Sequence, residues 1–447
     1  MTDHRTIPGV PEAAAVLAAP PAATSDAASP SRRRGQGQQQ RGRGRERRRP
    51  VVGLSSGFWL VAAAYTVTMA LNSLPTPLYP LYQARDGFST LMVTVVFGVY
   101  AGGLAVSLLL AGHISDWMGR KRVLVPALAL EVLCAAVFLF FPGLTGLLVG
   151  RFIGGLGTGA LTSTATAYLH DLRKAHRPDG DPVLFEIVST GANVGGLAAG
   201  PLVAGALAQY VSHPLRVPYI VFGVLVLAAV AAVALVPETV GELPVRPAYR
   251  PQRVSMDHGD RAGYVSAALT GFAAFAINGV YTALSAGFVV GTLHRTNHLL
   301  AGTVGFTLLA AATVSQVATS RLSRSARLGF GLAAGAAGFV LLTLGIQAQS
   351  LSVYLLAGIV GGAGSGTLFK TAIGDVAAMA VPAKRGEALS GLFLICYAGM
   401  SVPAVGIGIA VSHVSLTTAM YWFSGILLAV LAVTAVLARR TGPARAA

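Results

Sequence analysis

Four ionisable side chains lie inside long apolar stretches of the sequence, where a charge is costly unless it has a partner or faces water. Two of them are acids: Glu131 near the middle of one stretch and Asp375 near the end of another. A carboxyl group removed from water can load and release a proton during a reaction cycle. Glu131 is therefore either a proton carrier or a structural glutamate that is protonated or paired. Asp375 is a second candidate, or simply an interfacial charge.

The other two are cations, Arg151 and Lys370. Arg151 begins an R-x-x-G-G-x-G-x-G run whose glycines let helices pack closely. Arg151 either faces an aqueous cavity or a partner, or it extends to the headgroups, since it lies about two turns from the end of its stretch. Lys370 has three possible roles: it meets an anionic group of a substrate, pairs with Asp375, or extends to the surface. A spacing of five residues places Lys370 and Asp375 poorly on one helix face.

A short basic loop, G-H-I-S-D-W-M-G-R-K-R at 112–122, separates two apolar stretches. Gly112 and Gly119 allow a sharp turn, and Asp116 is then held near Arg120 and Lys121. By itself this pattern is consistent with a topology signal that has a capping aspartate.

A further apolar stretch contains Gly196, Gly200, Pro201 and Gly205. A proline inside a helix removes a hydrogen bond and bends the helix, and glycines beside it let the bent face approach a neighbour. We therefore expect a kinked helix that packs closely against another.

These residues must be positioned by membrane helices. Hydrophobic residues make up 54% of the 447 and charged residues only 11%, which excludes a soluble core. The stretches are also too long and too uniformly apolar for the strands of a membrane barrel. We predict twelve spans, at about 56–79, 90–111, 123–141, 144–167, 186–210, 217–237, 264–290, 299–319, 328–347, 353–378, 388–410 and 418–438.

Charge sets the expected orientation of these spans. Of the 33 Lys and Arg residues, 28 fall in the two tails, the central loop and the even-numbered connections, and three fall in the odd-numbered connections. Because positive residues stay in the cytoplasm, both termini are predicted to be cytoplasmic. The start of the chain is polar and Arg-rich, and we expect it to be a disordered cytoplasmic tail without a cleavable signal. No nucleic acid is needed to explain the net charge of +16.

The chain also repeats itself at an offset of 207 residues. The G-G-L-G-T-G run at 154–159 matches G-G-A-G-S-G at 361–366, and Arg120 matches Arg327. The predicted organisation is a tail over 1–54, a six-helix bundle over 55–237, a linker over 238–263, a second bundle over 264–440 and a tail over 441–447. The fold class is an all-α polytopic membrane protein in which a pseudo-twofold axis relates the two bundles.

The loop at 112–122 resembles the signature between the second and third helices of the major facilitator superfamily, and the likeness extends over about 55–440. The resemblance implies alternating access, a latching role for the loop, and proton coupling at Arg151. The glycine–proline pattern of the fifth span is similar to that of the family's drug–proton antiporters. The helices that line the cavity in this family carry Tyr65, Asn72, Asn278, Tyr281 and Lys370. The first four either contact substrate or hydrogen-bond neighbouring helices, and the second role is the commoner one.

We therefore expect a secondary transporter of the bacterial inner membrane. It would be a monomer that exports a small amphipathic molecule in exchange for protons. The alternatives are proton-linked uptake of a sugar or other metabolite, and a membrane sensor that signals through its Arg-rich tail. The first span contains no acid between Ser55 and Gln83, which weakens the case for a cationic substrate. No nucleotide-binding or metal-binding pattern is present, so we expect neither an enzyme nor a cofactor.

Overall fold

The computed structural model describes residues 52–111, 114–241, 249–251, 260–381 and 384–440, and the regular structure in this part of the chain is entirely helical. Twelve helical segments are long and apolar enough to cross a membrane, which confirms the predicted number of spans. In the first half these are α1 (Leu54–Ser73) with the short helix η1 (Thr76–Leu78) and α2 (Tyr79–Asp86), α3 (Thr90–Ala111), α5 (Arg120–Phe140), α6 (Leu144–His176), α7 (Pro182–Thr190) with η2 (Gly191–Gly195) and α8 (Gly196–Tyr210), and α9 (Val217–Leu235). In the second half they are α10 (Arg261–Gly287) with η3 (Phe288–Thr292), α11 (His298–Ala318), α12 (Arg324–Gln347), α13 (Leu351–Met379), α14 (Arg385–Val411) and α15 (Leu416–Arg440). The short helix α4 (Ser115–Met118) lies between α3 and α5.

Several helices are longer than the apolar stretches that predicted them. α6 continues to His176 rather than ending near 167, and the first span continues through α2 to Asp86 rather than ending near 79. Hydropathy detects the part of a helix that lies in lipid, whereas polar residues continue the same helix into water. The first span is also interrupted where Pro75 and Pro77 interrupt the backbone hydrogen bonding, which gives the single turn η1.

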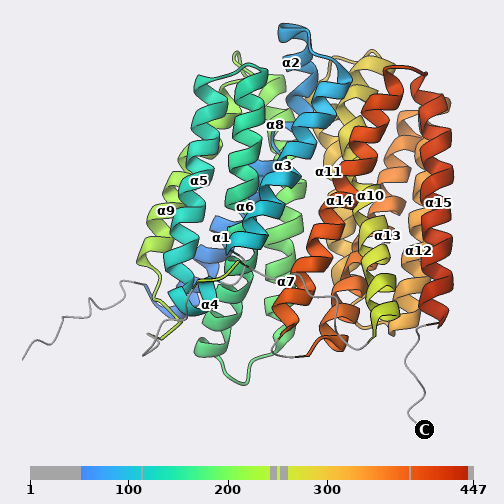
Figure 1. The fold of residues 1–447 in the computed structure, drawn as a ribbon. Coiled ribbons are helices and arrows are strands. Elements are labelled where there is room, and N and C mark those ends of the chain that lie inside the picture. Colours follow the sequence, from blue (N-terminus) through green and yellow to red (C-terminus); the bar gives the residue numbers. More distant parts are fainter. Residues whose placement is uncertain (1–51, 112–113, 242–248, 252–259, 382–383, 441–447) are drawn as a thin grey trace, which may run out of the picture. The chain divides into compact units, whose positions relative to one another are not determined.

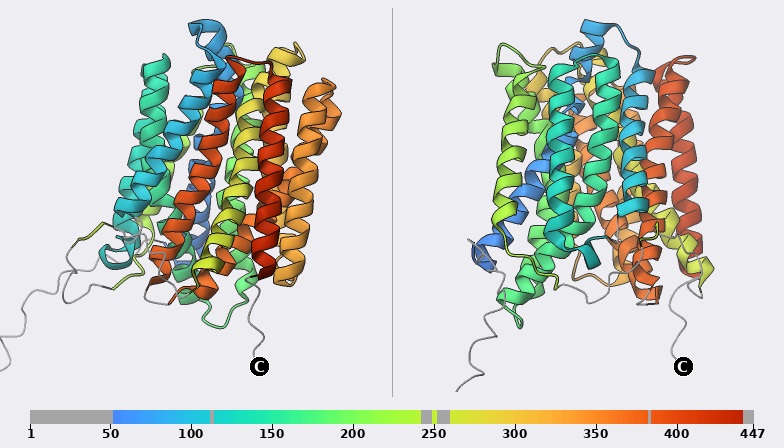
Figure 2. Two further views of the ribbon diagram at one scale, coloured as in Figure 1. Left: turned by 45° about the vertical axis from the view of Figure 1, so that its right-hand side comes forward. Right: turned by 60° about the vertical axis from the view of Figure 1, so that its left-hand side comes forward.

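Each half of the chain has its own apolar core. One cluster of buried residues runs from Phe58 to Val236, and the two larger clusters of the second half lie between Tyr264 and Leu431. Figures 1 and 2 show the helices that carry these residues. The halves meet along two seams: α8 packs against α11, and α3 packs against α14. The helices therefore form the two six-helix groups expected of the fold class.

The outer surface of the bundle is strongly apolar. Large hydrophobic side chains are exposed on many spans, among them Phe140 at 71%, Trp422 at 71% and Val224 at 61%. A protein surrounded by water rarely exposes such a continuous apolar surface, whereas one surrounded by lipid must. The chain is a multi-pass membrane protein.

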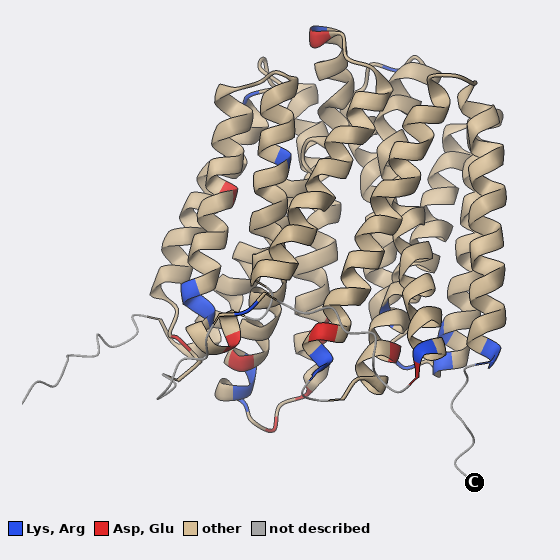
Figure 3. Cartoon of the chain, viewed as in Figure 1, with Lys and Arg blue, Asp and Glu red and all other residues tan. Residues whose placement is uncertain are grey.

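Charged residues gather at one end of the bundle (Figure 3). This basic end holds the C-terminal end of α6, the N-terminal end of α12 and the connection between α13 and α14. The opposite end holds α2 and the connection between α8 and α9. The two ends differ in charge, as the sequence predicts.

Candidate functional site

A buried polar cluster lies inside the first half, where α1, α5 and α6 meet. Glu131 on α5 has no exposed surface, and its two carboxylate oxygens accept separate hydrogen bonds. Asn72 on α1 donates to Oε2 over 3.0 Å, and Thr158 on α6 donates to Oε1 over 3.0 Å. Neither donor is a cation, and ionisation of a fully buried carboxyl group is costly without a nearby positive charge.

Arg151 on α6 lies in the same cluster and is only 3% exposed. Its guanidinium donates to the hydroxyl of Tyr79 over 2.5 and 3.0 Å and to the backbone carbonyl of Asn72 over 2.5 Å. It also stacks over the ring of Tyr100 at 5.5 Å from the centroid. Arg151 is therefore enclosed by protein and does not extend to the headgroups.

Two glycines of α6 make room for the acid. A Cβ atom added to Gly157 would lie 2.7 Å from Oε1 of Glu131, and one added to Gly154 would lie 2.9 Å from Oδ1 of Asn72. Gly155, in contrast, faces α3, where its Cβ would meet the backbone nitrogen of Leu104 at 2.8 Å. The glycine run thus serves helix packing, as the sequence predicts, and also shapes the acid site, which the sequence analysis missed.

The basic loop forms an ion-pair network at the basic end. Arg120 donates to Asp116 over 2.5 Å, to Ser115 over 3.0 Å and to Asp171 over 2.9 Å. Gly119 adopts a positive φ of 108°, which favours glycine. Gly112 lies outside the described residues. The predicted closeness of Asp116 and Arg120 is therefore present, and Asp171 on α6 completes the network.

Glu238, just after α9, caps the start of α5. Its carboxylate accepts from the backbone nitrogens of Arg120 and Lys121 over 2.9 and 3.0 Å, and Lys121 Nζ donates to the carbonyl of Val236 over 3.2 Å. An acid at a helix N-terminus satisfies free N–H groups and meets the positive end of the helix dipole. The sequence analysis missed Glu238 because its partners lie more than 100 residues away and no spacing rule connects them.

The glycine–proline pattern of the fifth span faces two neighbours. Gly196 and Gly200 lie against α1, where a Cβ on Gly196 would meet the carbonyl oxygen of Thr66 at 2.7 Å. Gly205 lies against α11 of the other half, where its Cβ would meet the α-carbon of Gly302 at 3.0 Å. Pro201 faces the same helix. The expected close approach is present, and it forms one of the two seams between the halves.

Lys370 and Asp375 do not pair, and the structure assigns each a different partner. Asp375 binds Arg324 on α12 through two hydrogen bonds of 2.6 and 2.8 Å. Lys370 bonds Glu186 on α7 of the other half and donates to the carbonyl of Gln316 over 2.8 Å. Because five residues turn a helix by about 500°, the two side chains leave α13 in different directions.

The other polar residues proposed to line a cavity bond neighbouring helices in this structure. Tyr65 lies 3.5 Å from the hydroxyl of Thr166, and Tyr281 donates to the carbonyl of Tyr354 over 3.3 Å. Asn278 accepts from Ser365 over 3.0 Å. Tyr65 and Tyr281 are each 1% exposed. They belong to the packed interior of their bundles in this conformation.

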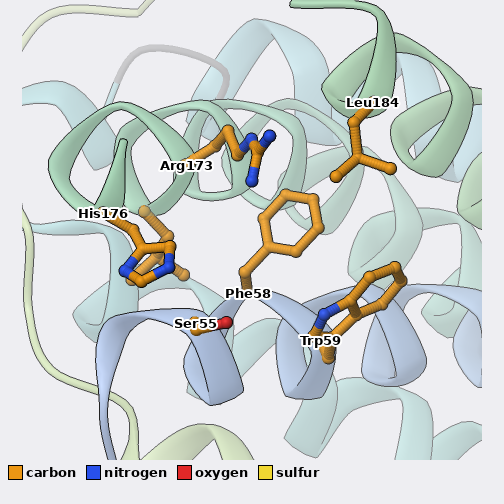
Figure 4. A pocket seen from close by; sticks show the side chains of 7 residues that line it. Ser55, Phe58, Trp59, Arg173, His176 and Leu184 are labelled. Carbon is orange, nitrogen blue, oxygen red and sulfur yellow. The ribbon is translucent and has the colours of Figure 1, made fainter. Parts of the chain in front are cut away.

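A small pocket opens where α1, α6 and α7 meet (Figure 4). Phe58 and Trp59 project from α1, with Arg173 and Leu184 above them in this view and His176 to one side. Ser55 and Leu172 complete the lining. None of these seven residues belongs to the acid cluster or to the predicted site residues. The pocket is therefore a separate feature.

The comparisons with known proteins agree with this architecture. The sequence profile of the Major Facilitator Superfamily matches residues 59–325. The "Multidrug resistance protein MdtL" of Escherichia coli O139:H28 (strain E24377A / ETEC) is 35% identical over 92 residues, which is 21% of this chain and 24% of MdtL. MdtL of Shigella boydii serotype 18 (strain CDC 3083-94 / BS512) matches equally. The chain thus matches about a quarter of the length of these curated relatives.

Solved structures share the fold at low sequence identity. A mutant of the nucleoside transporter NupG has a TM-score of 0.67 at 12% identity and covers 85% of this chain and 99% of its own. A POT family transporter in complex with 5-aminolevulinic acid has a TM-score of 0.69 at 11% identity, covering 87% and 96%. The human organic anion transporter MFSD10 has a TM-score of 0.60 at 18% identity, covering 85% and 99%. Because the family profile matches more than half of its length, the chain belongs to the Major Facilitator Superfamily.

Proposed function

We propose that this transporter exports a small amphipathic molecule in exchange for protons, with Glu131 as the group that carries the proton. The observation that carries the proposal is the environment of Glu131, which is fully buried and accepts from Asn72 and Thr158. Burial makes ionisation costly, whereas the two accepted hydrogen bonds and the nearby Arg151 favour the ionised form, so a small change in the site can shift the balance between the two forms. A transport cycle that exposes Glu131 to one side of the membrane and then to the other would move one proton per cycle.

In this proposal Arg151 is the positive charge whose interaction with Glu131 changes during the cycle. It is held close to the acid through Asn72, which bonds both residues. A shift of α1 relative to α6 would change the separation between the two groups. Because charge interactions are strong in a buried site of low dielectric constant, a small shift changes how readily Glu131 releases its proton. Movement of the helices and movement of the proton are then coupled.

The direction of transport rests on two further features. The partial likeness to a multidrug resistance protein and the glycine–proline pattern of α8 support export. The excess of positive residues supports a cytoplasmic basic end. The network of Asp116, Arg120 and Asp171 would then latch the cytoplasmic side of the first half, releasing and closing as the two halves rock.

The test uses inside-out membrane vesicles with an acidified lumen, an internal pH dye and a panel of lipophilic compounds. Addition of a transported compound should raise the lumenal pH. Glu131→Gln should abolish this response, and Glu387→Gln, the same change outside the cluster, should not. Arg151→Lys keeps the charge but loses the forked hydrogen bonds, so it should reduce the response strongly.

The opposite results are equally informative. An unchanged response in Glu131→Gln would remove Glu131 from the coupling mechanism. Accumulation of a nutrient by intact cells, without any response to lipophilic compounds in vesicles, would replace export by uptake.

A further inference from the structure

One ion pair joins the two halves of the transporter. Among the described residues, the pair of Lys370 on α13 and Glu186 on α7 is the salt bridge that connects the first half to the second. The remaining ion pairs, such as Arg324 with Asp375, lie within one half. Lys370 therefore lies at the boundary between the halves, where α13 faces α7.

Lys370 is held by its own half and neutralised by the other. The carbonyl of Gln316 on α11, which belongs to the same half, accepts from Nζ over 2.8 Å. The negative charge comes from Glu186, whose side chain is 42% exposed against 20% for Lys370. When the halves separate at this point, Lys370 keeps its neutral partner and loses its anion. A half-buried cation inside a membrane protein then requires another anion.

A row of aromatic side chains leads from the neighbour of Lys370 in the sequence towards the contact between α14 and α3. The next residue, Phe369, lies edge-on to Phe275 at 4.9 Å between ring centroids, and Phe275 lies edge-on to Tyr397 at 5.4 Å. Tyr397 in turn packs against a small cluster from α3 that includes Tyr100. A molecule that combines an anionic group with an apolar body matches both Lys370 and this row of aromatic side chains.

The acids near the seam are already occupied. Glu131 is enclosed by Asn72 and Thr158, and Asp375 is bound by Arg324. Glu186 is bound by Lys370. Separation of the halves would free Glu186 as well as Lys370, but the Glu186 side chain is 42% exposed against 20% for Lys370. Water therefore solvates the acid more readily, and the need for a new partner is greater at the cation.

We propose that Lys370 is the residue that binds the anionic group of the substrate, and that the transported molecules are amphipathic organic anions. In the substrate-free conformation, Glu186 pairs with Lys370 in place of that anionic group. This inference rests on the proposed function, since it names the substrate class of the same transport cycle. It differs from a simple gate because the two members of the ion pair have unequal roles.

The experiment compares three probes with one naphthalene body: 2-naphthoate, 2-naphthylmethanol and 2-naphthylmethyl-trimethylammonium. Binding to the purified full-length protein and flux in proteoliposomes are both measured. We expect 2-naphthoate to bind and to move. Lys370→Gln should weaken 2-naphthoate binding by about tenfold or more, because a charge-assisted bond is lost. Lys384→Gln, the same change at an exposed helix end, should leave binding unchanged.

Changes at Glu186 separate substrate binding from gating. Glu186→Gln removes the competing anion, so 2-naphthoate binding should stay the same or tighten. The exchanged pair Glu186→Lys with Lys370→Glu restores the salt bridge but should not restore 2-naphthoate transport. Equal losses in both single variants with recovery in the exchanged pair would overturn the proposal in favour of a gate.

The remaining outcomes of the three-probe experiment also test the proposal. Transport of the cationic or neutral probe without 2-naphthoate would overturn the substrate class and leave the proposed exporter intact. A wild-type protein that neither binds nor moves any of the three probes would contradict this inference, whereas the vesicle panel would still test the exporter separately.

Discussion

Glu131 and Arg151 lie on different helices and are joined through a single residue, Asn72. The side-chain amide of Asn72 donates to the carboxylate over 3.0 Å, and its backbone carbonyl accepts from the guanidinium over 2.5 Å. Both charges of the buried cluster therefore depend on the position of α1. Any movement of α1 changes the acid and the arginine together, which is the property that a coupled transporter needs.

Asn72→Ala separates these two connections. The change removes the amide donor to Glu131 but leaves the backbone carbonyl that binds Arg151. We expect proton-coupled transport to fall by about tenfold or more, and stability to fall by about 1–3 kcal/mol because a buried acceptor loses its partner. Flux in vesicles and thermal unfolding in detergent measure the two effects. Asn193→Ala, in the fifth span, is the matched control, and similar losses in both variants would argue against a specific link.

Gly157→Ala tests whether the glycine run shapes the acid site. The added methyl group would lie 2.7 Å from Oε1 of Glu131, so the carboxyl group must move away from Thr158. Overpacking of this kind costs about 1–3 kcal/mol, and we expect a lower unfolding temperature with loss of proton-coupled flux. Gly374→Ala on α13 meets nothing within 4 Å and should be neutral or slightly stabilising. Normal transport by Gly157→Ala would mean that the site tolerates displacement of the acid.

Asp116 and Glu238 lie far apart in the sequence, but we expect both acids to stabilise the basic loop. Asp116→Asn weakens the pairing with Arg120, and Glu238→Gln weakens the cap on the first turn of α5. Both variants should reach the membrane in normal amounts and transport several-fold more slowly. Quantitative blotting and initial rates of flux measure these effects, with the exposed Asp179→Asn as the control. Full activity in both variants would reduce the loop to a topology signal.

The contact between α8 and α11 predicts that a cross-link at the end of the bundle opposite the basic end can form in this conformation and hold the protein in it. The backbone nitrogen of His298 donates to the side chain of Gln209 over 2.8 Å, so cysteines at these two positions lie close together. In a chain that carries Cys134→Ala and Cys396→Ala, a short bifunctional methanethiosulfonate should join Gln209→Cys to His298→Cys and stop transport. A reductant should restore it. Transport that continues in the cross-linked protein would exclude separation of the halves at this end.

Local sequence patterns were enough to predict the class of the protein and its main helices. The length of each apolar stretch is a direct consequence of bilayer thickness, so the number of spans could be read without tertiary information. The pairing of Asp116 with Arg120 was predictable for a similar reason, because four residues on a short turn bring the two side chains together.

Spacing rules did not predict the partners that come from other helices. Lys370 and Asp375 are close in sequence, yet they bind Glu186 and Arg324, which lie 184 and 51 residues away. The cap formed by Glu238 and the donors to Glu131 were missed for the same reason. A single charged residue in an apolar stretch shows that a partner is needed, but it does not identify the partner.

The sequence by itself determined that this protein crosses a membrane twelve times, carries its positive charge at one end and keeps a few ionisable groups in its interior. These properties follow from hydropathy, charge and short-range geometry, which act along the chain. Only the tertiary structure decided that Glu131 and Arg151 share Asn72 and that Lys370 faces the other half. Those contacts depend on how helices rotate and pack, and packing sums many weak contacts between segments that are distant in the sequence.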